Sequence, residues 1–103
     1  MSRNKYAAKV DANQSLIVAF LRAHGLTVFC AHAVGGGFTD LVVRLKPQKF
    51  AWLVEVKDGD KPPSARKLTK AQVDFHAEWA GCVTIIENVE QAAALVSKIK
   101  GER

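Results

Sequence analysis

Two carboxylates and a lysine form the pattern in this chain that could do chemistry. Asp40 closes the segment Gly-Phe-Thr-Asp, and Glu55 and Lys57 stand two residues apart in Leu-Val-Glu-Val-Lys. Paired acids can hold a divalent cation through hard oxygen ligands, and a nearby ammonium group can stabilise negative charge that develops on a reacting phosphate. This chemistry requires that the fold bring the three side chains together.

A β-hairpin would bring them together. Residues 39–45 and 50–57 are rich in branched apolar residues, and Lys-Pro-Gln-Lys at 46–49 predicts a four-residue loop between two strands. In that register Asp40 lies opposite Glu55 and shares its face with Lys57. The other face is wholly apolar and is expected to be core, with three opposed pairs: Leu45 with Phe50, Val43 with Trp52, and Leu41 with Val54.

Like charges directly opposite each other destabilise a sheet, so this acid pair needs a cation or a shared proton as compensation. Two other interpretations are open: the register slips, or Glu55 and Lys57 are solvated charges at a sheet edge. Residues 50–56 form the most apolar strand of the chain, and we therefore expect this strand to be central. A central strand gives charges little access to water, which favours a functional site.

The surrounding elements are expected in the order α-β-β-β-α-β-α. Each helix starts with a residue that can cap, placed three before a glutamine as in a capping box, and ends at a glycine. These signals are Asp11, Gln14 and Gly25 for the first helix, Thr69, Gln72 and Gly81 for the second, and Asn88, Gln91 and Gly101 for the third. The strands are expected at 26–34, 39–45, 50–57 and 82–86, with three glycines at 35–37 ending the first. A hairpin followed by a helical crossover predicts an α/β fold with a mixed four-stranded sheet flanked by helices.

Composition narrows the class of protein. The chain has 103 residues, 49% of them hydrophobic, which suits one globular domain. We expect no membrane span and no secretory signal, because no apolar run is long enough. Cys30 and Cys82 are too few for a disulfide framework and are expected to be free, buried thiols. The net charge of +5 is concentrated at residues 1–9 and 57–70, which favours a polyanionic partner such as nucleic acid.

Together these motifs resemble a nuclease family. Asp40, then Glu55 and Lys57, then Gln72 on a following helix, resemble the PD-(D/E)XK nuclease pattern, whose core has the order αβββαβ. More narrowly, the segments DANQSLIVAFLRAHG, VGGGFTDLVVR, WLVEVKDGDKPPSARKLTKAQ and FHAEWAG resemble the VRR-NUC family of virus-type replication-repair nucleases, including its small stand-alone phage members. The resemblance covers residues 11–97. It implies a restriction-endonuclease-like αβββαβ(α) core.

The resemblance also implies residue roles. Asp40, Glu55 and the backbone carbonyl of Val56 would bind Mg²⁺ or Mn²⁺, which polarises the scissile phosphate and lowers the pKa of a bound water. Lys57 would first position that water and stabilise charge, and would act as a general base only second. Gln72 would lie at the same site, although helix capping also explains it.

Two positions depart from the family pattern. Thr39 stands where the superfamily motif has proline, a residue that shapes a turn and does no chemistry. Many relatives carry a glutamate on the first helix as a further metal ligand, and Gln14 stands at that place. Gln14 could offer an oxygen ligand, but its capping-box position is the favoured explanation.

Contacts to DNA are expected from three further groups. The turn glycines Gly36 and Gly37 would let the backbone approach a phosphodiester. His32 could contact a phosphate, or could serve no ligand. Cations of the loop stiffened by Pro62 and Pro63 and of the helix that follows would hold phosphates. These cations are Lys61, Arg66, Lys67 and Lys70.

These inferences predict a basic tail at 1–10 and a single nuclease domain at 11–100. The expected protein is a Mg²⁺- or Mn²⁺-dependent DNA endonuclease, a homodimer that resolves Holliday-type junctions in DNA repair, in the cytoplasm of a bacterial or phage-infected cell. The third helix and Trp79 are the candidate dimer contacts. The alternatives are a flap or single-strand nuclease, a non-catalytic nucleic-acid-binding module on the same fold, and an interaction domain without a nucleic acid partner.

Overall fold

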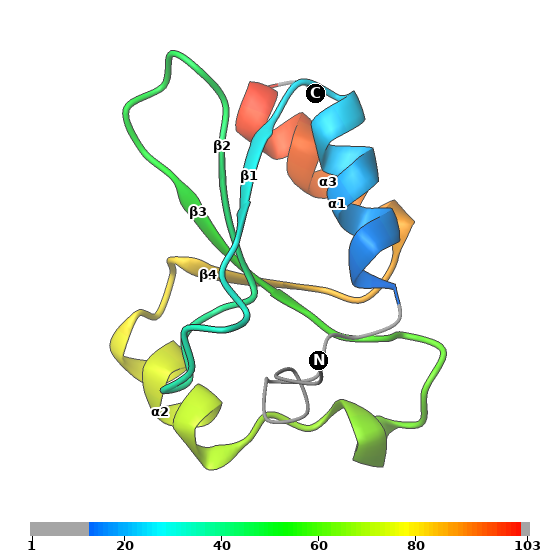
Figure 1. Cartoon of the computed structure of the whole chain (residues 1–103), viewed down its shortest axis with the longest axis vertical. Coiled ribbons are helices and arrows are strands. Elements are labelled where there is room, and N and C mark those ends of the chain that lie inside the picture. The colour runs from blue at the N-terminus through cyan, green and yellow to red at the C-terminus, as the bar shows by residue number, and fades with distance from the viewer. Residues whose placement is uncertain (1–12, 102–103) are drawn as a thin grey trace, which may run out of the picture.

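The hairpin expected from residues 39–57 forms the centre of a mixed four-stranded sheet (Figure 1). The computed structural model describes residues 13–101, so the basic tail at 1–10 and the helix signal at Asp11 lie outside the described residues. The strands lie side by side in chain order, antiparallel from β1 to β3 and parallel from β3 to β4. They are β1 (Thr27–Cys30), β2 (Leu41–Arg44), β3 (Trp52–Val56) and β4 (Val83–Ile86).

The predicted register of the hairpin is confirmed for the residues that pair, but the expected core pair of Leu45 with Phe50 is wrong, because β3 begins only at Trp52 and Phe50 is 56% exposed. Leu41 pairs with Val54 and Val43 pairs with Trp52. Leu41, Val43 and Val54 are fully buried, and Trp52 packs on them under the ammonium group of Lys98. Strand β3 lies between β2 and β4, as its apolar composition predicted.

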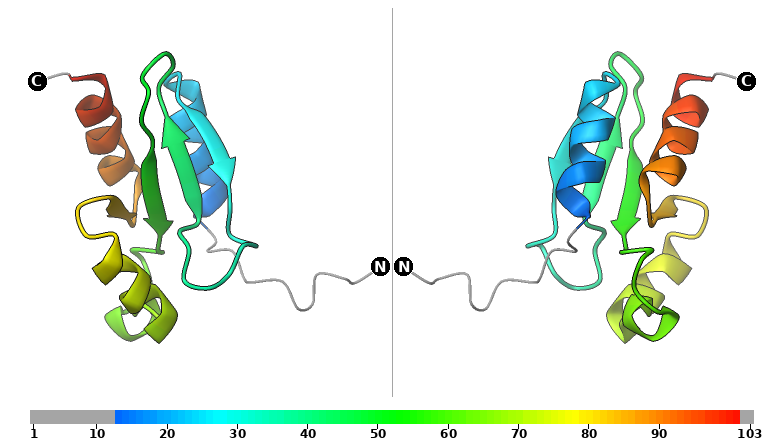
Figure 2. Two further views of the ribbon diagram at one scale, coloured as in Figure 1. Left: turned by 90° about the vertical axis from the view of Figure 1, so that its left-hand side faces the viewer. Right: turned by 90° about the vertical axis from the view of Figure 1, so that its right-hand side faces the viewer.

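Two helices cover one face of the sheet. Helices α1 (Gln14–Ala23) and α3 (Val89–Lys100) pack against each other and against the same side of the strands (Figures 1 and 2). Each presents an apolar stripe at helical spacing to the sheet, which is why both are integrated in the core. The buried residues that they contribute are Ile17, Val18, Leu21, Ala92, Leu95, Val96 and Ile99. The apolar residues of α3 are thus largely used within the chain, contrary to the expectation that they form a dimer contact.

Helix α2 (Lys70–Glu78) is built differently. It has no buried residue, and Val73 and the C-cap residue Trp79 are 50% and 49% exposed. It lies beside the end of the sheet, away from α1 and α3 (Figure 1). A short 3₁₀ helix, η2 (Pro63–Arg66), precedes it in the loop that contains Pro62 and Pro63. The position of α2 therefore depends on specific contacts and not on a shared core.

The helix-start signals have different outcomes. The capping box of α2 is present, with Thr69 and Gln72 bonded reciprocally. At α3 the Asn88 side chain accepts from the Gln91 amide, but the Gln91 side chain accepts from Glu87. At α1 the prediction is wrong, because the helix begins at Gln14, which leaves Gln14 at its first position.

The Asn13 side chain explains the different start of α1. Its amide donates to the carbonyl oxygens of Lys57 and Glu87, at 2.9 and 3.1 Å, and makes no cap hydrogen bond. It thereby ties the start of α1 to the ends of β3 and β4.

Within residues 13–101 no helix is long and apolar enough to cross a membrane.

Candidate functional site

Asp40 lies at the point where β2 begins to pair. Thr39 directly before it is fully buried, and its hydroxyl donates to the carbonyl of Leu41 at 3.2 Å, which fixes the turn into the strand. The carbonyl of Asp40 accepts from the amide of Ala31, and its Oδ2 accepts from the amide of Val56 at 2.8 Å. Thr39 therefore has a structural role where the family motif has proline.

The Asp40 carboxylate takes the place of a ladder partner. The amide of Val56 faces β2, but β2 begins at Leu41 and leaves this amide without a strand partner. Because a residue in a strand directs its N–H and C=O to the same side, the carbonyl of Val56 also faces the region beside Asp40. This geometry groups two of the three expected metal ligands.

Glu55 is the buried acid of the pair, with a side chain that is 1% exposed. Its Oε2 accepts from Nε2 of Gln72 at 2.9 Å and lies 3.8 Å from Nζ of Lys57. Nζ of Lys57 also donates to Oε1 of Gln72 at 3.4 Å, and the Lys57 side chain is 14% exposed. A buried carboxylate is unfavourable unless it is paired and hydrogen-bonded, and this cluster supplies both kinds of contact.

Gln72 makes both of the contacts that the sequence left open. Its Oε1 accepts from the amide of Thr69 at 2.9 Å, which completes the capping box, while its Nε2 reaches Glu55. The cap fixes the side chain so that its two ends face opposite partners. Capping and contact with the site are therefore not alternatives for this residue.

His76 joins the cluster from one turn further along α2, and sequence reasoning assigned it no role. Its Nε2 lies 3.8 Å from Oε1 of Glu55. Burial first, and then the charge of Lys57, lower the pKa of His76 below its ordinary value of 6.5. The lowered pKa favours the neutral form of His76, and only the protonated form would make its contact with Glu55 an ion pair. Its spacing from Gln72, one helical turn, is the signal that could have identified it.

The turn before Asp40 packs on the start of α2. Gly37 has a φ of +85°, and a Cβ at this position would overlap the carbonyl oxygen of Ala71. Phe38 contacts Phe75 edge to face, with ring centroids 5.4 Å apart. The lack of a side chain at Gly37 is thus required by contact with α2. Gly36, with a φ of +67°, has open space around its Cα.

Gln14 and His32 line a separate recess of about 330 Å³ between α1 and the end of β1. Gln14 is buried, and its Oε1 has no hydrogen-bond partner within residues 13–101. Nδ1 of His32 is likewise buried without a partner in this part of the chain. Gln14 stands at the first position of α1 and not at the third position of a capping box, and the expected partner Asp11 lies outside the described residues. Cys30 lines the same recess, and both it and Cys82 are exposed free thiols instead of buried ones.

The four cations that we expect to bind phosphates differ in whether they are paired with a carboxylate. Lys61 and Lys67 are exposed. Arg66 donates to Glu87 at 3.0 Å, and Lys70 pairs with Asp74 at 2.9 Å on the exposed surface of α2. An ion pair lowers the positive charge that a side chain can offer a phosphate, so Lys61 and Lys67 are the better candidates.

The side-chain and backbone groups around Asp40 and Glu55 offer oxygen atoms. No group of three or more histidine, cysteine, aspartate or glutamate side chains within residues 13–101 could hold a metal ion. A site built on Asp40 and Glu55 would therefore need oxygens of another kind, such as the Val56 carbonyl. Carboxylate and carbonyl oxygens are the ligands that Mg²⁺ and Mn²⁺ prefer.

The chain was compared with known proteins by sequence and by structure. No protein-family model matches it, and no curated protein or solved structure matches it significantly.

Proposed function

We propose that this protein is a metal-dependent DNA endonuclease of the PD-(D/E)XK class, similar to the VRR-NUC family. The observation that carries the proposal is the cluster around the buried Glu55 carboxylate, which is bonded to Gln72 and lies beside Lys57, with the Asp40 carboxylate on the next backbone amide. The residues come from a strand pair and a separate helix, so the cluster is a product of the fold and not of one segment.

Each residue of the cluster has a distinct task in this proposal. Asp40, Glu55 and the Val56 carbonyl would hold Mg²⁺ or Mn²⁺, which supplies Lewis-acid stabilisation of the phosphate and a more acidic water. Lys57 places a positive charge where negative charge develops on the phosphate. Gln72 fixes the carboxylate of Glu55, because its own side chain is held by the Thr69 cap.

A structural interpretation of the same cluster has specific support. Helix α2 has no buried residue, and Gln72 and His76 both contact Glu55. The cluster could therefore serve to dock α2 in a non-catalytic nucleic-acid-binding module. The two interpretations differ in what a Glu55→Gln substitution does, because glutamine keeps an oxygen that can accept from Gln72 but loses the charge.

Cleavage assays on duplex, single-stranded, flap and four-way-junction DNA test the proposal. We expect cleavage with Mg²⁺ or Mn²⁺ and none in EDTA. Asp40→Asn and Glu55→Gln should abolish cleavage while DNA binding remains. Glu78→Gln, which removes an exposed carboxylate of α2, should cleave like the wild type. Wild-type activity in Asp40→Asn, or absence of cleavage on every substrate with either metal, would contradict the proposal.

The proposed substrate and assembly are branched DNA and a homodimer. One site of this size cuts one strand, and two sites related by a two-fold axis match the symmetry of a four-way junction. With α3 largely buried, exposed apolar side chains of α2 and β4 remain for a dimer contact: Val73, Trp79 and Ile85. Light scattering at micromolar concentration should give twice the mass of one chain. A monomer that cuts flaps but not junctions would favour a flap nuclease.

A further inference from the structure

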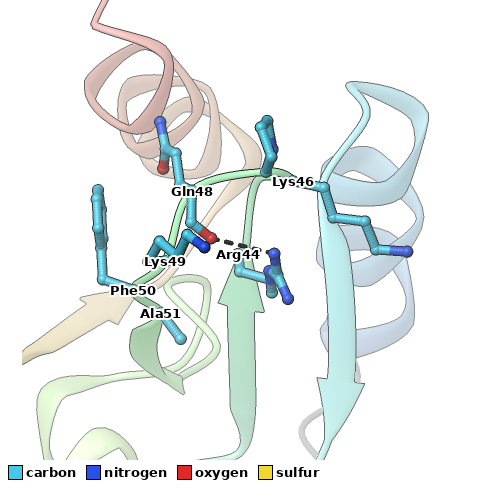
Figure 3. A pocket seen from close by; sticks show the side chains of 7 residues that line it. Arg44, Lys46, Gln48, Lys49, Phe50 and Ala51 are labelled. Atoms are coloured by element: carbon cyan, nitrogen blue, oxygen red, sulfur yellow. Dashed lines mark hydrogen bonds between the residues drawn. The ribbon is translucent and has the colours of Figure 1, made fainter.

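The loop of the β2–β3 hairpin lies at the opposite end of these strands from Asp40 and Glu55. It lines an open recess of about 650 Å³ (Figure 3). The lining residues include three cations, Arg44, Lys46 and Lys49, and no acid. The sequence from 41 to 51 likewise contains no aspartate or glutamate. The recess is thus locally strongly positive.

Arg44, Lys46 and Lys49 form no ion pair with a carboxylate of residues 13–101, a property that they share with Lys61 and Lys67. Lys57, Arg66 and Lys70, in contrast, each lie within 4 Å of a carboxylate. Uncompensated like charges repel one another, and a bound polyanion would relieve this repulsion.

The backbone of the loop is held in a defined shape. The amide of Gln48 donates to the carbonyl of Leu45 at 2.8 Å, and Nη2 of Arg44 donates to the carbonyl of Gln48 at 3.1 Å. Nε2 of Gln48 donates to the carbonyl of Ile99 at 3.0 Å, which fastens the loop to the end of α3. Figure 3 shows Arg44 and Lys49 beneath the tip of this loop. The positive charges are therefore presented by a fixed support.

An aromatic ring lies beside the cations. The side chain of Phe50 is 56% exposed, and its ring meets that of Trp52 edge to face at 6.3 Å. A single exposed apolar residue needs no explanation by itself. Exposed aromatic rings next to backbone-binding cations are, however, the combination with which proteins bind unpaired nucleic acid, since each base offers a face for stacking.

We propose that the hairpin loop binds an unpaired nucleic-acid strand, with Arg44 and Lys49 on its phosphates and Phe50 stacked on a base. This goes beyond the proposed nuclease function, because it requires neither metal nor cleavage. Phe50 lies five residues before Glu55 in the chain, which corresponds to about 17 Å at the rise of an extended strand. The loop would then hold the unpaired arm of a branched substrate.

Fluorescence anisotropy in EDTA tests the proposal without any contribution from cleavage. The probes are a labelled single-stranded oligonucleotide of about 12 nucleotides and the matching duplex. The variants are Arg44→Ala, Lys49→Ala, Phe50→Ala and Phe50→Trp. Arg22→Ala removes one positive charge from α1, together with a hydrogen bond to the carbonyl of Val28, and is the charge-matched control. Circular dichroism confirms that each variant is folded.

We expect Phe50→Ala to weaken single-strand binding about tenfold or more and duplex binding less than about twofold. Phe50→Trp should retain single-strand binding. Arg44→Ala and Lys49→Ala should each weaken binding and lower the salt slope by roughly 0.7, more than Arg22→Ala does. Single-strand affinities within twofold of the control in all these variants would overturn the proposal.

Two further outcomes would also overturn it. Equal losses for single strand and duplex in Phe50→Ala would exclude base stacking. Binding of the loop to vesicles containing anionic phospholipid, abolished by Phe50→Ala while oligonucleotide binding is unchanged, would identify a membrane surface as the partner. Because every measurement is made without metal, absence of nuclease activity leaves these results interpretable.

Discussion

The two ends of the β2–β3 hairpin carry opposite charges on one pair of strands. At the end near α2, Asp40 and the buried Glu55 are held by the amide of Val56 and by Gln72. At the loop end, Arg44 and Lys49 line an open recess with no counter-ion in the described chain. Chemistry requires fixed, desolvated groups, whereas binding of a phosphate backbone requires only accessible charge. The contrast underlies the different tasks that we propose for the two ends.

A lysine substitution at each end should separate these tasks most strongly. Lys57→Ala removes the positive charge beside Glu55, and we expect cleavage at saturating DNA to fall about 10²–10³-fold, as for loss of one transition-state donor. Lys49→Ala should change cleavage at saturating DNA less than about threefold and act on the apparent KM. Single-turnover kinetics measure both. Equal losses in the two variants would remove the distinction between the ends.

The turn that supports the acidic end should be sensitive to added volume. Gly37→Ala places a Cβ on the carbonyl of Ala71 at a positive φ, and we expect it to lower the free energy of unfolding by about 2–3 kcal/mol. Gly36→Ala introduces the same backbone strain, but a Cβ at this position meets no other atom. We expect it to lower the free energy of unfolding by about 1 kcal/mol. Urea denaturation compares the two variants. A smaller effect at Gly37 than at Gly36 would contradict the packing described for this turn.

Helix α2 should depend on the acidic end for its position. Gln72→Ala removes both the cap and the hydrogen bond to Glu55, and we expect about tenfold slower cleavage with faster amide exchange across residues 70–79. Gln91→Ala serves as the control. It removes the hydrogen bond that the Gln91 side chain accepts from the amide of Glu87 at the start of α3, a helix that is packed in the core. Hydrogen exchange that changes equally in both helices would show that α2 is held by other contacts.

The smallest expected effect is a titration. In metal-free protein, the NMR pKa of His76 should lie below 6.5, and Lys57→Met should raise it part of the way, because burial remains. Since the folded pKa is lower than the unfolded one, the contribution to stability is present above pH 6.5 and is lost as the pH falls through the folded pKa. A His76 pKa above 6.5 would mean that Glu55 outweighs burial and Lys57.

The sequence predicted the sheet better than the helix starts, for a physical reason. The apolar alternation of the hairpin permits one register only, because a slip by one residue exposes Leu41, Val43 and Val54 together. At α1, the start of the helix depends on which polar residue is the N-cap, Asp11 as predicted or Asn13 as in the structure. The Asn13 side chain bridges the ends of β3 and β4, a long-range contact that no local pattern reveals.

The sequence predicted the acidic residues of the candidate site but not the residues that hold them in place. Asp40 and Glu55 follow from the hairpin alone, and the contact of Gln72 with Glu55 follows from the family pattern. His76, the Thr39 hydroxyl and the fit of Gly37 against Ala71 depend on where α2 lies. Because α2 has no buried stripe, its sequence carries no packing signal from which this position could be derived.

Metal binding at the acid pair is the most direct test of the account. Titration of Mn²⁺ followed by electron paramagnetic resonance measures bound and free ion without any DNA. We predict that Asp40→Asn and Glu55→Gln each weaken Mn²⁺ binding about tenfold or more, while Glu78→Gln and Lys49→Ala leave it unchanged. Equal Mn²⁺ affinity in the wild type and in the Asp40→Asn, Glu55→Gln double variant would contradict the central claim that this end of the hairpin is a metal-dependent nuclease site.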